Sequence, residues 1–106
     1  MTINYIWNMQ GYGMFSEKEA RVIKRNWGTS GLEVANKIAS LIMFDGFSNP
    51  TNQAFVEMAY ILETPLALTA HILEMLIDRG IVYCENEHNQ KVRAPKQVIY
   101  GNSYSY

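Results

Sequence analysis

The stretch from Gln53 to Arg93 constrains the fold most tightly, because two helical patterns follow each other across a very short break. Apolar residues recur at helical spacing between about residues 51 and 62, and a second helical pattern spans about residues 65–79. Pro65 suits the first position of a helix, and Gly80 is a natural end for one. The stretch therefore predicts two helices joined by a tight turn.

Short β-prone segments follow the second of these helices. Ile81 to Cys84 favours a strand, the polar residues 85–90 favour a turn, and Lys91 to Arg93 is predicted to return as a second strand that Pro95 ends. Gln97 to Tyr100 is predicted as a third strand. The second half of the chain is thus expected to end in a small β-hairpin.

This order of elements resembles the winged helix-turn-helix superfamily of DNA-binding domains. Ala54 to Ala59 is similar to the family's first motif helix, Leu62 to Pro65 to its turn, and Leu66 to Val82 to its reading helix and exit. Cys84 to Arg93 would then be the wing. Glu63 departs from the pattern, since it stands where the family often has glycine. The resemblance implies a mainly α fold with a small β-hairpin (α+β), a winged helix-turn-helix with an additional N-terminal helix.

Capping signals predict two helices in the first half of the chain. Each helix has a serine at its start and a glutamate three residues later: Ser16 with Glu19, and Ser30 with Glu33. The first helix should run from about residue 17 to Gly28, a natural stop. The second should end near Phe44 and would be the usual supporting helix of the motif.

The remaining segments complete the predicted organisation. Ile3 to Trp7 is β-prone and is expected as a short edge strand, and Asp45 to Asn49 is expected as a loop. We predict an N-terminal extended segment over residues 1–15, a winged helix-turn-helix domain over residues 16–100, and a flexible tail over residues 101–106.

The composition fits one domain of ordinary polarity. The chain has 106 residues, a formal net charge of −1 and one cysteine. Because Cys84 cannot form an internal disulfide, we expect a reducing compartment, the cytoplasm. The longest apolar run, Ile38 to Phe44, is interrupted by Ser40 and is too short for a membrane span. With no signal peptide visible either, no membrane partner is expected.

The outer face of the predicted reading helix is poorly suited to reading bases. With Thr69 at the centre of the buried face, the opposite face presents Ala67, His71, Glu74 and Asp78. Base readout favours Arg, Lys, Asn and Gln, none of which lies there. We therefore expect only weak DNA contacts from this helix, made by Ala67, Thr69 and His71. The alternative is an ordinary amphipathic helix whose outer face is solvated, which is the favoured interpretation for His71 taken alone.

Basic side chains lie elsewhere, and no Lys or Arg occurs between Phe44 and Asp78. The predicted wing and its exit carry side chains that suit phosphate or minor-groove contacts: Asn89, Gln90, Lys91, Arg93 and Lys96. A solvated basic hairpin without a ligand is an equally good interpretation of these residues. Lys18, Arg21 and Arg25 lie on one face of the first helix at i, i+3, i+7 spacing. That basic stripe is expected to be solvated surface or, as a second interpretation, a contact for phosphate or an acidic partner.

Two functional hypotheses follow. The first is a small transcriptional regulator that binds double-stranded DNA through the wing and helix 65–79; a homodimer on two-fold symmetric half-sites would offset weak contact per protomer. The alternative is a winged-helix protein-interaction module, an adaptor or modulator of a transcription or replication complex without direct base readout.

Other kinds of site find little support in the sequence. Cys84 and His88 are too few for a structural zinc site, which requires four ligands, so no metal or other cofactor is expected. Cys84 also lacks a recognisable base and orienting acid, and an enzyme is therefore not expected.

Overall fold

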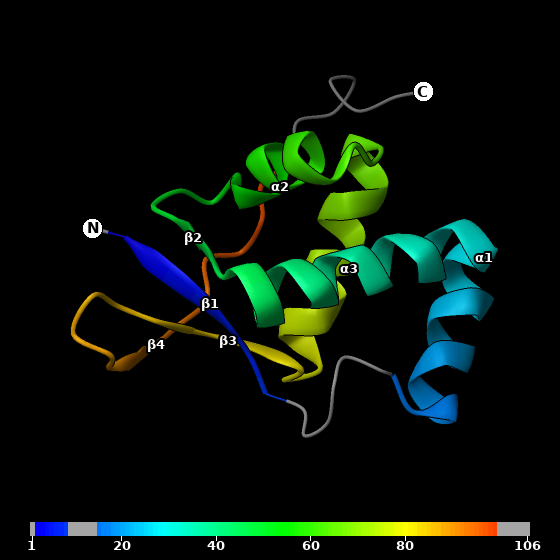
Figure 1. Ribbon diagram of the computed structural model, residues 1–106, viewed down its shortest axis with the longest axis horizontal. Helices are drawn as coiled ribbons and strands as arrows, with labels where there is room; N and C mark the ends of the chain where they lie inside the picture. The colour runs from blue at the N-terminus through cyan, green and yellow to red at the C-terminus, as the bar shows by residue number, and fades with distance from the viewer. Residues whose placement is uncertain (1, 9–14, 100–106) are drawn as a thin grey trace.

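The described part of the chain folds into three α-helices and a small four-stranded antiparallel sheet (Figure 1), which confirms the predicted α+β class. The computed structural model describes residues 2–8 and 15–99, so the predicted tail and Tyr100 lie outside the described residues. The elements are β1 (Ile3–Trp7), α1 (Glu17–Ser40), the π-helical turn η1 (Leu41–Asp45), β2 (Phe47–Asn49), α2 (Ala54–Leu62), α3 (Leu66–Asp78), β3 (Val82–Glu85) and β4 (Lys91–Val92).

Strand β1 lies inside the sheet, so the prediction of an edge strand is wrong. The strand order is β2-β1-β3-β4, and β1 pairs antiparallel with a neighbour on each side. Tyr5 stands opposite Phe47 in β2 and opposite Cys84 in β3, and its side chain is only 2% exposed. The β-prone residues predict a strand here from the sequence, but its partners β2 and β3 lie too far along the chain for a local pattern to identify them.

Strand β2 replaces the loop that was predicted for Asp45 to Asn49. Gly46 turns the chain at a φ of 77°, and Phe47 then buries its ring against Tyr5, with 5.5 Å between the ring centroids. Ser48 donates a hydrogen bond from its hydroxyl to the side-chain oxygen of Asn4. The prediction failed because β2 is held by contacts with β1 rather than by its own sequence preference.

Helix α1 consists of two halves that meet at Gly28, as the sequence predicts. Gly28 has a φ of 74° and a ψ of −168°, a conformation outside the helical region that glycine alone adopts readily. The predicted cap at Ser16 is present, since its hydroxyl oxygen accepts the Glu19 backbone N–H at 3.2 Å. Figure 1 shows the two halves running in sharply different directions. The second half continues into η1, close to the predicted end near Phe44.

Helices α2 and α3 occupy the two segments predicted from Gln53 onward. α2 begins at Ala54, three residues after the predicted start. α3 begins at Leu66, so Pro65 stands at the N-cap position rather than at the predicted first position, and no side chain caps the helix. Among the described residues no single helix is long and apolar enough to cross a membrane. α2 and α3 satisfy that criterion of length and composition only when counted together, and the chain bends by 117° between them.

Helix α3 passes through the middle of the core. Its inward residues are fully buried together with side chains from both halves of α1 and from α2: Ile23, Ile38, Phe55, Met58, Ile72, Leu73 and Leu76. Residues 93–99 follow without regular structure, so the described part of the predicted third strand is absent. Instead, the Val98 backbone N–H donates to the carbonyl of Asn52 at 2.9 Å, and the Gln97 side chain is buried.

Candidate functional site

The corner between α2 and α3 has the backbone geometry that glycine normally provides. Glu63 adopts the left-handed conformation, with φ 54° and ψ 50°. The Thr64 backbone N–H donates to the Ala59 carbonyl at 3.0 Å and closes the end of α2. The turn therefore has the backbone geometry that glycine normally provides, although glutamate occupies the position. The backbone of Glu63 is strained as a result.

Thr69 cannot contact a ligand, which corrects its assignment as a DNA-contacting residue. The side chain is 0% exposed, and its hydroxyl donates to the Pro65 carbonyl at 2.7 Å. The Thr64 and Thr69 hydroxyl oxygens lie 2.6 Å apart. Because this hydroxyl is already satisfied inside the protein, Thr69 fixes the corner to the first turn of α3 and takes no part in an outer surface.

The N-terminal end of α3 borders an open apolar hollow of about 390 Å³. Ala67 and the exposed His71 line it, as the sequence placed them on the outer face. Trp27, Pro65 and Leu68 complete the lining, and these three were not predicted as site residues. Trp27 is half-buried at the end of the first half of α1, where it packs against the core. The sequence could not place Trp27 beside α3, because the direction of the chain after Gly28 depends on tertiary contacts and not on neighbouring residues.

Glu74 does not point freely to solvent, which corrects its placement on the outer face. It is half-buried, and its carboxylate accepts the Gln97 backbone N–H at 3.0 Å. Gln97 in turn donates from its side chain to the Pro95 carbonyl at 2.9 Å and to the Tyr5 hydroxyl at 3.5 Å. Burial raises the pKa of Tyr5 to about 12. The segment 93–99 is thus tied to α3 and β1, and it leaves Asp78 as the free carboxylate on this face of α3.

The β3–β4 hairpin owes its tip to Asn86. The side-chain oxygen of Asn86 accepts the backbone N–H groups of His88 and Gln90 at 2.9 and 3.0 Å, and its amide donates to the Gln90 side chain at 3.0 Å. Asn89 has a φ of 60°, which asparagine tolerates better than most residues. Asn89 and Gln90 therefore have a structural role in the turn, while both remain exposed.

The cations of the hairpin and its exit are all accessible. Lys91, Arg93 and Lys96 are exposed, and the Lys91 ammonium lies 5.3 Å from the centroid of the Tyr83 ring. Only Glu85 and Glu87 offer carboxylates within the hairpin. This part of the molecule thus carries more positive than negative side chains, as the sequence indicated.

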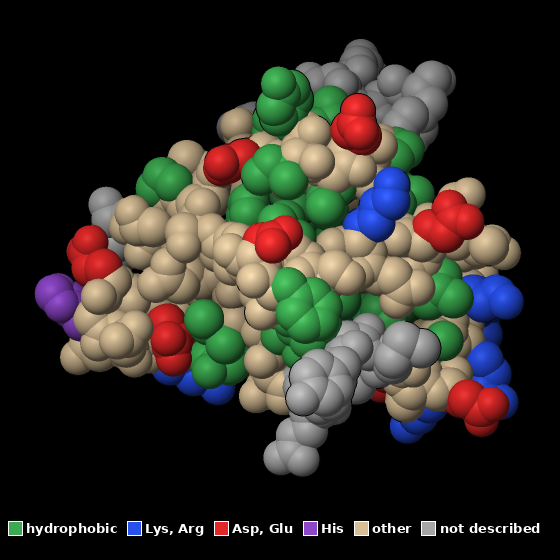
Figure 2. Space-filling view, viewed as in Figure 1, with side chains coloured by type: hydrophobic (Ala, Val, Ile, Leu, Met, Phe, Trp, Pro, Cys, Tyr) green, Lys and Arg blue, Asp and Glu red, His purple; other side chains and the backbone are tan. Residues whose placement is uncertain are grey.

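A second group of cations lies on the N-terminal half of α1, residues 17–27. Lys18, Arg21, Lys24 and Arg25 are all exposed. Figure 2 shows Lys and Arg side chains gathered over this half of α1 at the lower right, and others below the β3–β4 hairpin at the lower left. The two groups lie on opposite sides of α3 in the view of Figure 1.

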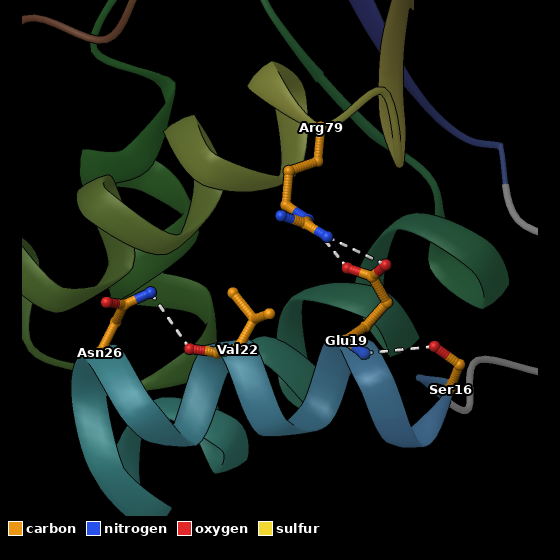
Figure 3. A network of polar contacts seen from close by, with 5 residues as sticks. All are labelled: Ser16, Glu19, Val22, Asn26 and Arg79. Carbon is orange, nitrogen blue, oxygen red and sulfur yellow. Dashed lines mark hydrogen bonds and ion pairs between the residues drawn. The ribbon is translucent and has the colours of Figure 1, made fainter.

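An ion pair fastens this half of α1 to the end of α3. The Arg79 guanidinium donates to both carboxylate oxygens of Glu19, at 2.8 and 3.1 Å (Figure 3). The hydrogen bond that Arg79 donates to the Glu19 carboxylate is the main cause that raises the pKa of Arg79 above its ordinary value. Glu19 thus uses its backbone for the cap at Ser16 and its carboxylate for a residue sixty positions away.

Cys84 is fully buried on β3, and burial raises the pKa of its thiol to about 11. His88 lies exposed near the tip of the hairpin. Within residues 2–8 and 15–99 no group of three or more His, Cys, Asp or Glu side chains is arranged to hold a metal ion.

Comparison with protein-family models, with curated proteins and with solved structures gives no match for this chain.

Proposed function

We propose that this protein is a winged helix-turn-helix module that binds double-stranded DNA as a small transcriptional regulator. The observation that carries the proposal is the corner formed by α2 and α3, in which three residues join two helices at a bend of 117°. Helix-turn-helix motifs join their helices at about 90–120° through a turn of this length. The β3–β4 hairpin with its exposed cations follows α3 directly, in the place of a wing.

Binding would depend more on phosphate contacts than on base readout. Helix α3 contains no Lys or Arg, and near its first turn Leu66, Ala67 and Leu68 are half-buried and His71 is exposed. Lys91, Arg93 and Lys96 supply the charge that phosphates require. A homodimer would place two such surfaces on one duplex, and weak contact by each protomer would then suffice.

Reversing the charge of the hairpin tests the proposal. The Lys91→Glu/Arg93→Glu variant should bind a mixed-sequence duplex of about 20 base pairs, or two helical turns, far more weakly than the wild type at low salt. Fluorescence anisotropy across a salt titration measures the loss. Lys37→Glu, which reverses one exposed cation on the C-terminal half of α1, is the matched control for the single variant Lys91→Glu and should cause a much smaller loss than that variant. Equal affinities for the wild type and the hairpin variant would contradict the proposal.

The apolar hollow beside α3 favours a second candidate function, a winged-helix module for protein interaction. Trp27, Pro65 and Leu68 form a surface of the kind that receives an apolar anchor from a protein partner. Such a module would need no affinity for DNA. A wild-type chain that binds no duplex even at low salt would therefore favour this candidate over the first.

A further inference from the structure

Residues 93–99, which we call the strap, cross the face of α3 that also carries Ala67 and His71. The strap is the orange trace that runs from β4 towards α2 in Figure 1. The Gln97 backbone N–H donates to the carboxylate of Glu74 at 3.0 Å. Glu74 follows the exposed His71 by three residues, and residues three apart are neighbours on the surface of a helix. The strap therefore covers α3 one turn beyond His71, while Ala67 and His71 line an open hollow.

The strap is anchored around Gln97 although it has no regular structure. The Gln97 side chain is 6% exposed and donates to the Pro95 carbonyl at 2.9 Å, and the Val98 backbone N–H donates to the Asn52 carbonyl at 2.9 Å. The side-chain oxygen of Gln97 is the one buried side-chain polar atom without a hydrogen-bond partner in the described part of the chain. A buried acceptor that lacks a donor destabilises the folded state. Stability alone therefore does not account for a buried glutamine at this position.

This anchoring holds Lys96 beside the middle of α3. Lys96 directly precedes Gln97, so its backbone lies next to the Glu74 carboxylate that accepts the Gln97 N–H. The Lys96 side chain is exposed, and the Arg79–Glu19 pair is the one ion pair among the described residues, so no carboxylate there neutralises Lys96. Helix α3 has no Lys or Arg of its own. Lys96 thus brings a positive charge to the border of the open part of a helix that carries none.

We propose that Glu74 is a positioning residue for DNA binding, which holds the strap so that the Lys96 ammonium meets a phosphate of a duplex facing Ala67 and His71. The inference rests on the proposed DNA-binding function and adds to it a residue that itself contacts no DNA. A free carboxylate on this face of α3 would repel phosphates. Because the strap covers Glu74 and uses it as an acceptor, the same carboxylate instead brings a cation to the duplex.

Two variants of Glu74 in the full chain separate the hydrogen bond from the charge. Glu74→Gln keeps a side-chain oxygen that can accept the Gln97 N–H, whereas Glu74→Ala keeps none. Both variants remove the same negative charge, which by itself should strengthen binding to phosphates. We therefore expect Glu74→Gln to bind a mixed-sequence duplex of about 20 base pairs at least as tightly as the wild type. Glu74→Ala should bind the same duplex more weakly than Glu74→Gln does.

A double-mutant cycle shows whether Glu74 acts through Lys96. One phosphate contact contributes roughly 0.9 to the slope of log affinity against log salt concentration. Lys96→Gln should therefore make this slope shallower by about 0.9 when residue 74 is changed to Gln, and by much less when it is changed to Ala. Between about 50 mM and 200 mM salt, that change in slope corresponds to roughly 3.5-fold in affinity. Fluorescence anisotropy measures the binding.

The matched control for the cycle is Lys91→Gln. Lys91 lies on β4 and is held by the sheet, so this change should alter the slope equally in both backgrounds. If Glu74→Ala does not fold, Glu74→Asp is compared with the wild type instead. Its shorter side chain draws the carboxylate away from the strap and leaves the charge unchanged.

The possible outcomes separate this inference from the proposed function. If the wild type binds duplex DNA and the Lys91→Glu/Arg93→Glu variant loses affinity, while Lys96→Gln changes the slope equally in both backgrounds, the inference is wrong and the proposed function stands. The same holds if Lys96→Gln changes the slope in neither background. If the wild type binds no duplex at low salt, the proposed function and the inference are both wrong.

Discussion

Thr69 and Glu74 illustrate how far single residues can be placed from the sequence. Helical spacing put Thr69 at the centre of the buried face of its helix, and it is fully buried. Helical spacing could not show which group accepts the hydrogen bond of the Thr69 hydroxyl. That the acceptor is the Pro65 carbonyl, and not a ligand, depends on where the preceding turn lies. Glu74 was placed outside by the same spacing, but the segment around Gln97 folds back and covers it.

The buried thiol of Cys84 gives a pH dependence with a definite sign. Burial raises its pKa from 9.0 to about 11, so the folded state favours the neutral thiol. The resulting contribution to stability is complete below pH 9 and is lost as the pH rises from 9 towards 11. Urea unfolding midpoints should fall over this range for the wild type and fall less for Cys84→Ala. Tyr5, whose pKa burial raises from 10.0 to about 12, should add a later decline in both proteins. Equal declines between pH 9 and 10 would contradict the assignment.

Elements defined by local signals were predicted well, and elements defined by distant contacts were not. The cap at Ser16, the break at Gly28 and the end of α3 before Gly80 each depend on a few neighbouring residues. The central place of β1 and the existence of β2 depend on pairing between segments far apart in the chain. The same holds for the N-terminal half of α1, whose position beside α3 is fixed by contacts such as the Arg79–Glu19 pair.

The end of α2 provides a prediction at the scale of an element. Because Glu63 is left-handed, a Cβ atom at this position is strained and glycine is favoured. The Glu63→Gly variant should be more stable than Glu63→Ala by about 1 kcal/mol in free energy of unfolding. The pair of variants removes the same charge, so that the comparison isolates the backbone. Chemical denaturation measures both, and an alanine variant at least as stable as the glycine variant would show that the corner is not strained as described.

At the scale of the whole molecule, the arrangement of charge matters more than its sum. The net charge is −1, yet the exposed cations beside α3 form two groups, one on α1 and one on the β3–β4 hairpin. The sequence indicated both groups and the lack of cations on α3. It could not show that α3 lies between them, because that arrangement depends on the turn at Gly28 and on the sheet. The separation of these two groups of cations by a helix with little capacity for base readout is therefore a consequence of the tertiary structure.

Mapping the binding surface by NMR tests this central claim most directly. Amide signals of the full chain would be followed while a mixed-sequence duplex of about 20 base pairs is added at low salt. We expect shifts at residues 88–93 and in the first turn of α3, with little change on the exposed face of α2 at Val56 and Tyr60. Shifts confined to α2, or no shifts at all, would contradict it.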